Sequence, residues 1–246
     1  MKSRINKNIS VDNVIFGFDG NDLNVLLVER TLRVPGRLKP VFSDFTLAGN
    51  HILEDEDLDK AASRILYELA GISGVYLEQF GSFAGPDRLN RKNDRLWLES
   101  LGLNPDNRVV SVGYFSLLNS NNVKLTLTNR NVSWHPVSRT GSLGYDHNRI
   151  LLTALEKLRN KITIDPVPVF ELLPEKFTLS QLQKVYEVVF NVALDKRNFR
   201  RKVLRMKYLV PLKEKQKGVT HKPAQYYFFS KELYTYSKRD FFDFFV

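Results

Sequence analysis

The chain has 246 residues, 43% of them hydrophobic, which is enough for one large domain or two ordinary ones with a buried core. It contains no cysteine, which excludes disulfide bridges, thiolate metal sites and thiol nucleophiles and is typical of a reducing compartment. No run approaches the roughly eighteen apolar residues of a membrane span, and the basic start lacks the apolar segment of a signal peptide. We therefore expect a soluble, cytoplasmic protein that does not bind membranes.

The net charge of +10 is concentrated at one end of the chain. Residues 166–246 contain 16 Lys and Arg against 8 Asp and Glu, whereas the preceding residues carry a net charge of only +2. A well-solvated surface usually interleaves both signs, so this asymmetry indicates two domains with different partners. The basic part is expected to meet a polyanion such as nucleic acid.

Alternating apolar residues predict a series of strands in the first part of the chain. Two of them, joined by the turn "GND", predict a β-hairpin. The strands are expected at 10–19, 23–30, 45–50, 75–84, 108–118, 123–128 and 132–137. Helical spacing predicts helices from Glu56 to Leu69 and over 146–161.

Two segments lie outside this pattern. Residues 85–107 form a long polar insertion, typical of a binding loop or a disordered excursion, with one or two helical turns at "RLWLESLGL". Residues 162–170, "ITIDPVPVF", contain two prolines, which favour an extended connection. We place the domain boundary here, with one domain over 1–163 and the other over 164–246.

Residues 49–72 read "GNHILEDEDLDKAASRILYELAGI". In spacing they resemble a metal-binding catalytic motif, the Nudix box. The matching charged residues are Glu56, Arg64 and Glu68. The departures are Asn50 in place of glycine, and Ile65 and Leu69 in place of glutamates. A divalent ion needs several oxygen ligands presented together, and apolar neighbours raise the cost of holding charge. We predict no metal site, no cofactor and no catalytic residue, with the three charged residues joined in salt bridges that preserve the fold.

Residues 178–205 have the order helix, short turn, basic helix, which is that of a helix-turn-helix. Thr178 and Gln181 have the spacing of a capping box, and Asp195 is placed to cap the second helix. In that helix Phe199 and Val203 are expected to face the core, with basic residues on the opposite side. Arginine can donate two hydrogen bonds to guanine, and asparagine can read adenine, so this face has base-reading chemistry.

Strands at 208–212 and 224–230 with a lysine-rich tip predict the wing of a winged helix. From Lys196 to Lys222 there are eleven basic residues and one acid, Glu214, which indicates phosphate contact. The residues expected to contact DNA are Lys196, Arg197, Asn198, Arg200, Arg201, Lys202, Arg205, Lys215, Lys217, His221 and Lys222.

The two halves together resemble the Nudix-related transcriptional regulators, a bacterial family. The resemblance is carried by the altered box and by "YDHNRILLTALEKLR", "FTLSQLQKVYEVVF" and "HKPAQYYFF". It implies an α/β Nudix sandwich, a mixed sheet between helices, followed by a winged helix-turn-helix domain. It further implies a DNA-binding regulator, expected to be a repressor, that binds a palindromic operator as a homodimer. Its Nudix domain would sense a small molecule, which is an ADP-ribose compound in one branch and a sugar in another.

The missing carboxylates favour an uncharged or weakly charged effector, and we expect a pentose such as arabinose. Candidate contacts are Asn50, Asp87, Arg88 and His147, because amides, carboxylates and imidazoles can hydrogen-bond hydroxyls. Asp87 and Arg88 fit a solvated turn equally well, and His147 also fits a hydrogen bond at a helix start.

Two other function classes remain open. One is a Nudix hydrolase that acts on ADP-ribose or a related nucleoside diphosphate with a non-standard metal site. The other is an RNA-binding protein that uses the aromatic run "YYFF" as a stacking platform, although its place after a wing-like hairpin favours the wing.

Overall fold

The computed structural model describes residues 4–123, 125, 131–218 and 222–242. Within them, a seven-stranded mixed sheet is built around the long strand β1 (Ile5–Phe18). This strand pairs antiparallel with β2 (Leu23–Leu32) and β4 (Ala48–Leu53), and parallel with β6 (Val110–Asn119). The outer strands are β3 (Phe42–Thr46) and β7 (Val132–Pro136), both on β2, and β5 (Glu78–Phe83) on β6. The predicted hairpin is confirmed, whereas the strand expected at 123–128 falls largely outside the described residues.

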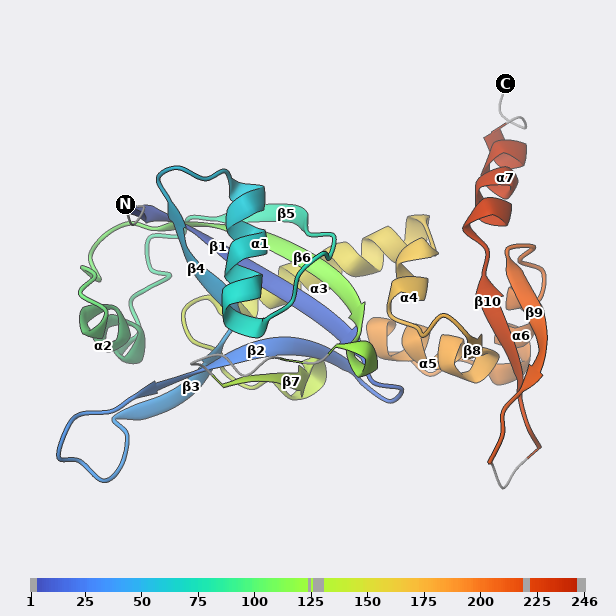
Figure 1. The fold of residues 1–246 in the computed structure, drawn as a ribbon, viewed down its shortest axis with the longest axis horizontal. Coiled ribbons are helices and arrows are strands. Elements are labelled where there is room, and N and C mark those ends of the chain that lie inside the picture. The colour runs from blue at the N-terminus through green and yellow to red at the C-terminus, as the bar shows by residue number, and fades with distance from the viewer. Residues whose placement is uncertain (1–3, 124, 126–130, 219–221, 243–246) are drawn as a thin grey trace.

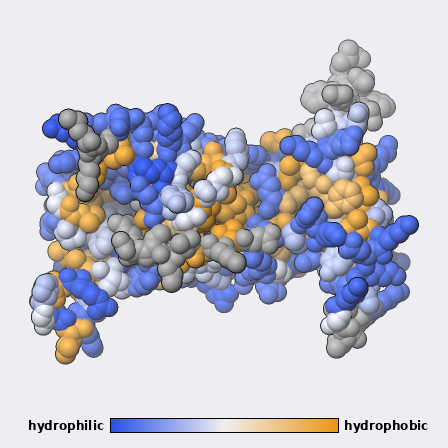
Figure 2. Space-filling model, in the orientation of Figure 1, coloured by the Kyte–Doolittle hydropathy of each residue, from blue (hydrophilic) through white to orange (hydrophobic). Residues whose placement is uncertain are grey.

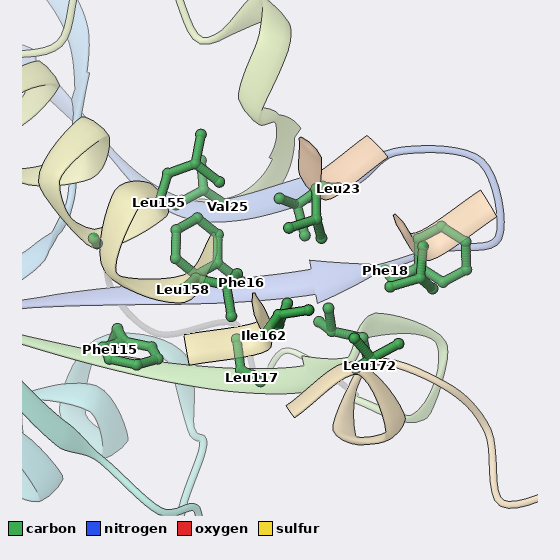
Figure 3. Packing of buried hydrophobic residues seen from close by; sticks show 14 of the residues in the cluster. Phe16, Phe18, Leu23, Val25, Phe115, Leu117, Leu155, Leu158, Ile162 and Leu172 are labelled. Atoms are coloured by element: carbon green, nitrogen blue, oxygen red, sulfur yellow. The ribbon is translucent and has the colours of Figure 1, made fainter. Parts of the chain in front are cut away.

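Helices cover both faces of this sheet (Figure 1). One face packs against α1 (Leu58–Ala70), where Val11 and Val28 meet Ile65. The opposite face packs against α3 (His147–Ile164), where Phe16 and Val25 meet Leu158 (Figure 3). Because successive side chains of a strand point to opposite faces, one apolar strand can serve both layers. The expected mixed sheet between helices is thus the observed architecture.

The long insertion contains the helix α2 (Lys92–Ser100), which confirms the helical turns predicted there. Leu98 on this helix packs with Leu89 and Val109 in a small apolar cluster. Asp94, also on α2, is fully buried, so the insertion is fastened to the body of the sheet.

The extended connection predicted over 162–170 is wrong. Helix α3 continues to Ile164, and a short helix, α4 (Val167–Glu171), follows after Asp165. Pro166 caps α4 and Pro168 lies in its first turn, where the backbone N–H groups need no partner inside the helix. Prolines at a helix start and prolines in an extended segment therefore look alike in the sequence.

The C-terminal part has the elements of a winged helix. Thr178 and Gln181 form the predicted capping box at the start of α5 (Leu179–Phe190), and Asp195 caps α6 (Lys196–Val203) by accepting from the Asn198 backbone N–H. A three-stranded sheet follows the order β8 (Phe177–Thr178), β10 (Gln225–Phe229) and β9 (Leu209–Lys215). The last helix is α7 (Lys231–Phe242).

One apolar cluster runs from the large sheet through α3 into the winged helix. It includes Ile162 of α3, Leu172 after α4 and Val189 of α5. Arg159 on α3 donates from Nε to the backbone oxygen of Val189 at 2.7 Å, so polar contact accompanies the packing. The boundary expected after residue 163 falls near the end of α3 and stays a prediction, because the core is continuous across it. Over the described ranges, we find no helix with the length and apolar character to cross a membrane.

Candidate functional site

The altered box retains its frame, and its two remaining carboxylates are both engaged by an arginine. Ile65 is fully buried under the sheet, while Arg64 binds both nearby carboxylates. Its Nε lies 2.8 Å from Glu56 Oε2, and its Nη1 lies 2.9 Å from Glu68 Oε2. The hydrogen bond from Arg64 holds the pKa of the Glu56 carboxyl below its usual range.

The salt bridges predicted among these three residues are therefore present. Among the residues that the structure describes, no group of three or more His, Cys, Asp and Glu side chains is arranged to hold a metal ion. A divalent metal does not fit this box, because the two carboxylates that remain are both engaged by one guanidinium.

A pocket of about 90 Å³ opens between β1, β4, the insertion and the start of α3. Three of the four predicted effector residues line it, namely Asn50, Arg88 and His147. The fourth, Asp87, does not line it, because its exposed carboxylate accepts a hydrogen bond from Asn90 at 2.8 Å. The structure thus brings together the amide, one guanidinium and the imidazole.

The floor of the pocket is organised by the buried carboxylate of Asp12. His147 Nδ1 accepts from the Leu47 backbone N–H at 2.9 Å, so the ring carries its proton on Nε2, which lies 3.3 Å from Asp12 Oδ1. Arg88 Nη2 lies 3.5 Å from Asp12 Oδ2, to which Ser111 also donates. Burial raises the pKa of Asp12, but His147, Arg88 and Ser111 outweigh it and hold that pKa well below its usual range. Asp12 is therefore ionised.

A second arginine, Arg30 on β2, forms one wall of the pocket and was missed from the sequence. Its Nε donates to Asp44 Oδ1 and its Nη2 donates to Asp44 Oδ2, both at 2.7 Å. Nη2 also donates to Asp94 Oδ1 at 2.7 Å. The guanidinium carbon lies 4.5 Å from the centre of the Tyr145 ring and 5.8 Å from that of Trp97. A signal did exist, since Arg30 stands two residues after buried Val28, at an inward position of an apolar strand.

The second candidate surface lies on α6. Val203 is buried and Phe199 packs against Tyr186, with ring centres 5.8 Å apart, as the spacing predicted. The opposite side is exposed and carries Arg197 and Arg201. Arg201 Nη2 donates to Asn198 Oδ1 at 2.8 Å, so the two polar groups are held side by side.

The remaining predicted DNA contacts surround this face. The exposed ones on α6 and just after it are Lys196, Arg200, Lys202 and Arg205. On the hairpin Lys215, Lys217 and Lys222 are exposed, and Figure 2 shows hydrophilic side chains around it, while His221 falls outside the described residues. A groove of about 1180 Å³ between α5, α6 and the hairpin is lined by four cations, Lys184, Lys196, Arg200 and Lys222.

Two of the four aromatic side chains of β10, those of Tyr227 and Phe229, pack against the apolar core instead of standing free for base stacking. The Phe229 ring stacks on Phe170 with ring centres 4.2 Å apart, and it also contacts Tyr208 and Tyr234. Because this aromatic cluster is engaged within the winged helix, the RNA-binding alternative loses the feature that favoured it.

Comparison with known proteins agrees with this geometry. Residues 169–229 match the family model of the NrtR DNA-binding winged helix domain. The ADPR-responsive transcriptional repressor NtrR of Acinetobacter baylyi is 30% identical over 234 residues, covering 93% of this chain and 84% of the relative. A pentose effector finds no support here, since that relative is named for a response to ADP-ribose.

Solved structures agree as well. The crystal structure of Shewanella oneidensis NrtR complexed with a 27mer DNA has a TM-score of 0.64 and 25% identity, covering 92% of this chain and 95% of that one. A MutT/nudix family protein from Enterococcus faecalis, 20% identical with a TM-score of 0.60 over 92% of this chain and 89% of that one, shares the fold. The chain belongs to the NrtR family of Nudix-related transcriptional regulators, DNA-binding proteins that join a Nudix-fold sensor to a C-terminal winged helix.

Proposed function

We propose that this protein is a transcriptional repressor that binds a two-fold operator as a homodimer and changes its DNA affinity when ADP-ribose, or a compound of that class, occupies the pocket. The observation that carries the proposal is the contrast between an engaged box and an open pocket. Arg64 binds both remaining box carboxylates, whereas Asn50, Arg88 and His147 line a cavity beside them. This arrangement supports ligand sensing without pyrophosphate hydrolysis.

The name of the Acinetobacter relative supports ADP-ribose as the effector class. Its hydroxyls need the kind of groups that the pocket offers, namely a guanidinium, an imidazole and an amide. On this proposal residues 1–163 form the sensor and residues 164–246 the DNA-binding domain. Asn50, Arg88 and His147 would contact the effector, while the basic residues of α6 and the hairpin would contact the operator.

Helix α3 provides the connection between the two functions. His147, its first residue, lines the pocket, and Arg159, near its other end, donates to the backbone of α5. A ligand that moves His147 therefore acts on an element that is packed against the helix-turn-helix. Small shifts at an effector site can be amplified in this way, because packed cores switch between discrete arrangements.

The test measures both affinities of the full-length protein, operator binding with and without ADP-ribose and ADP-ribose binding with and without operator. Thermodynamic linkage requires the two ratios to be equal, and we expect each affinity to fall about tenfold or more in the presence of the other ligand. Arabinose serves as the comparison ligand. Turnover of ADP-ribose with magnesium above roughly 1 per second would favour the hydrolase alternative instead.

A further inference from the structure

The groove of about 1180 Å³ between α5, α6 and the hairpin is not built by the winged helix alone. Gly20 and Asn21, at the tip of the turn between β1 and β2, line it together with its four cations. Figure 1 shows this turn at the end of the sensor sheet, next to α5, which β2 contacts. No Asp or Glu is found among the described residues that line the groove. A surface with the charge to bind a polyanion thus has one wall in the sensor.

We propose that the sensor contacts the operator directly, with the side-chain amide of Asn21 donating to a backbone phosphate of the DNA strand that lies along this groove. The DNA contacts expected from the sequence all lie on the winged helix, at α6 and on the hairpin. The inference rests on the proposed operator binding and extends the operator interface from one domain to both. It does not depend on which effector the pocket takes.

The amide of Asn21 is available for such a contact. The residue is exposed, and within the described ranges its side-chain amide has no hydrogen-bond partner, whereas its backbone N–H donates to Asp19 Oδ1 at 2.8 Å. Side-chain amides are among the groups that donate to phosphate oxygens of DNA. Because every nucleotide carries the same phosphate, this contact adds affinity and orientation without reading a base.

The turn that carries the amide has a fixed shape. Asp19 Oδ1 also accepts from the Asp22 backbone N–H at 2.9 Å, and Asp19 Oδ2 accepts from Asn24 Nδ2 at 2.9 Å. Gly20, at the tip, has a φ of 105°, which side chains other than glycine rarely adopt. The backbone at Asn21 is therefore ordered before DNA arrives, and binding does not have to order it.

The two acids of the turn are engaged elsewhere. The carboxylate of Asp19 is occupied by three donors, and Asp22 Oδ2 lies 3.1 Å from Arg139 Nη2. Neither acid lines the groove. A phosphate that approaches Asn21 from the groove side therefore has four cations beside it, which offset the repulsion from these two carboxylates.

The turn is also seated firmly beside the winged helix. Phe18 and Leu23, the residues on either side of it, are buried in the same apolar cluster as Leu172 and Leu179 (Figure 3 shows the first three). Because a packed core resists deformation, the turn keeps its place next to α5. A change in the orientation of the sensor would move Asn21 relative to the bound strand, so the contact makes operator affinity sensitive to that orientation.

The test uses the full-length protein with two duplexes, an operator selected from a random library and a random-sequence duplex of equal length. We expect Asn21→Ala to weaken both duplexes by the same factor, about tenfold for a dimer that loses two such bonds. Asn21→Lys places a cation at the contact, so the slope of log K against log[salt] should become steeper by about 0.9 per subunit. The matched controls are Asn8→Ala and Asn8→Lys, at an exposed residue near the start of β1, and both should leave affinity and slope unchanged.

Unaltered thermal midpoints establish that the variants are folded, as substitutions at an exposed turn residue should be. Full affinity of Asn21→Ala together with an unchanged salt slope of Asn21→Lys would overturn the inference and leave DNA binding by the winged helix standing. A loss confined to the operator would also overturn it, because a phosphate contact weakens all duplexes alike. Equal changes of slope in Asn21→Lys and Asn8→Lys would do the same, since they would reflect net charge alone. A wild-type protein that binds neither duplex would contradict the proposed function itself.

Discussion

Two arginines organise the two polar clusters of the sensor, and they differ in what they leave unused. Arg64 directs every nitrogen of its guanidinium to an acceptor, on Glu56, Glu68 or the backbone oxygen of His51. Arg30 is more deeply buried, and in the part of the chain that the structure describes its Nη1 atom has no acceptor at full hydrogen-bond geometry. In the box, the hydrogen bonds of Arg64 are thus all made within the protein. At Arg30 one buried donor has no such bond. This second cluster borders the pocket of the proposed effector site.

The strongest test of this difference between the two clusters is to restore a carboxylate to the box. Ile65→Glu places a charge at a position that is 0% exposed, and it should destabilise the protein by about 4 kcal/mol or more, as measured by urea unfolding. Tyr67→Glu on the same helix, at a position that is 61% exposed, should change stability by no more than about 0.5 kcal/mol. An Ile65→Glu variant that is stable and binds magnesium would contradict the conclusion that a divalent metal does not fit the box.

Asp94→Ala tests the second cluster from the insertion side. The change leaves the buried Arg30 with Asp44 alone and removes the acceptor for the Tyr145 backbone N–H. Removing one partner of a buried ion pair costs about 3 kcal/mol or more, which thermal or urea unfolding would detect. The control is Asp106→Ala, which breaks the exposed pair with Arg95 and should cost less than about 1 kcal/mol. Equal losses would mean that Asp94 does not fasten the insertion.

In the DNA-binding half, the comparison is between a residue expected to recognise bases and a residue expected to contact phosphates. Arg197→Ala on α6 should cost about 1 to 3 kcal/mol on the preferred operator and relax base preference, whereas Lys217→Ala on the hairpin should weaken all duplexes alike. If the dimer neutralises about eight phosphates, log K should fall against log[salt] with a slope near −7. Selection from a random duplex library should return a two-fold motif. A pool without such symmetry would contradict the homodimer proposal.

The smallest effect is expected at the part-buried pair of Arg64 and Glu56 in the box. Arg64 lowers the pKa of Glu56, so the pair stabilises the folded state above the unfolded pKa of about 4.3, and this contribution is lost as the pH falls through the lower folded pKa. Glu56→Gln should therefore be less stable than wild type by about 1 kcal/mol at pH 7, and this difference should shrink as the pH falls through the lowered pKa of Glu56. A stability difference that is independent of pH would assign the effect to packing instead.

The predictable parts of this molecule depend on local chemistry. The capping box of Thr178 and Gln181, the cap at Asp195 and the two faces of α6 follow from side chains within a few residues of each other. The contact between Arg30 and Asp94 joins residues 64 positions apart, so only the tertiary fold could place Asp94 against β2. Asp87 and Arg88 illustrate the same limit, because an irregular loop has no period that would tell which of two neighbours points inward.

On the proposed function, helix α3 is a lever arm between the pocket and the winged helix. Its 18 residues span about 27 Å at 1.5 Å per residue, with the pocket-lining His147 at one end and the packing against α5 near the other. A rotation of about 5° about the pocket end would displace the far end by about 2 Å. In a two-fold dimer such a displacement occurs once in each subunit, so the spacing between the two copies of α6 changes by up to twice that amount. The spacing of the two half-sites on B-DNA is set by the helical repeat. A small rotation at the sensor would therefore shift the two copies of α6 out of register with the two half-sites.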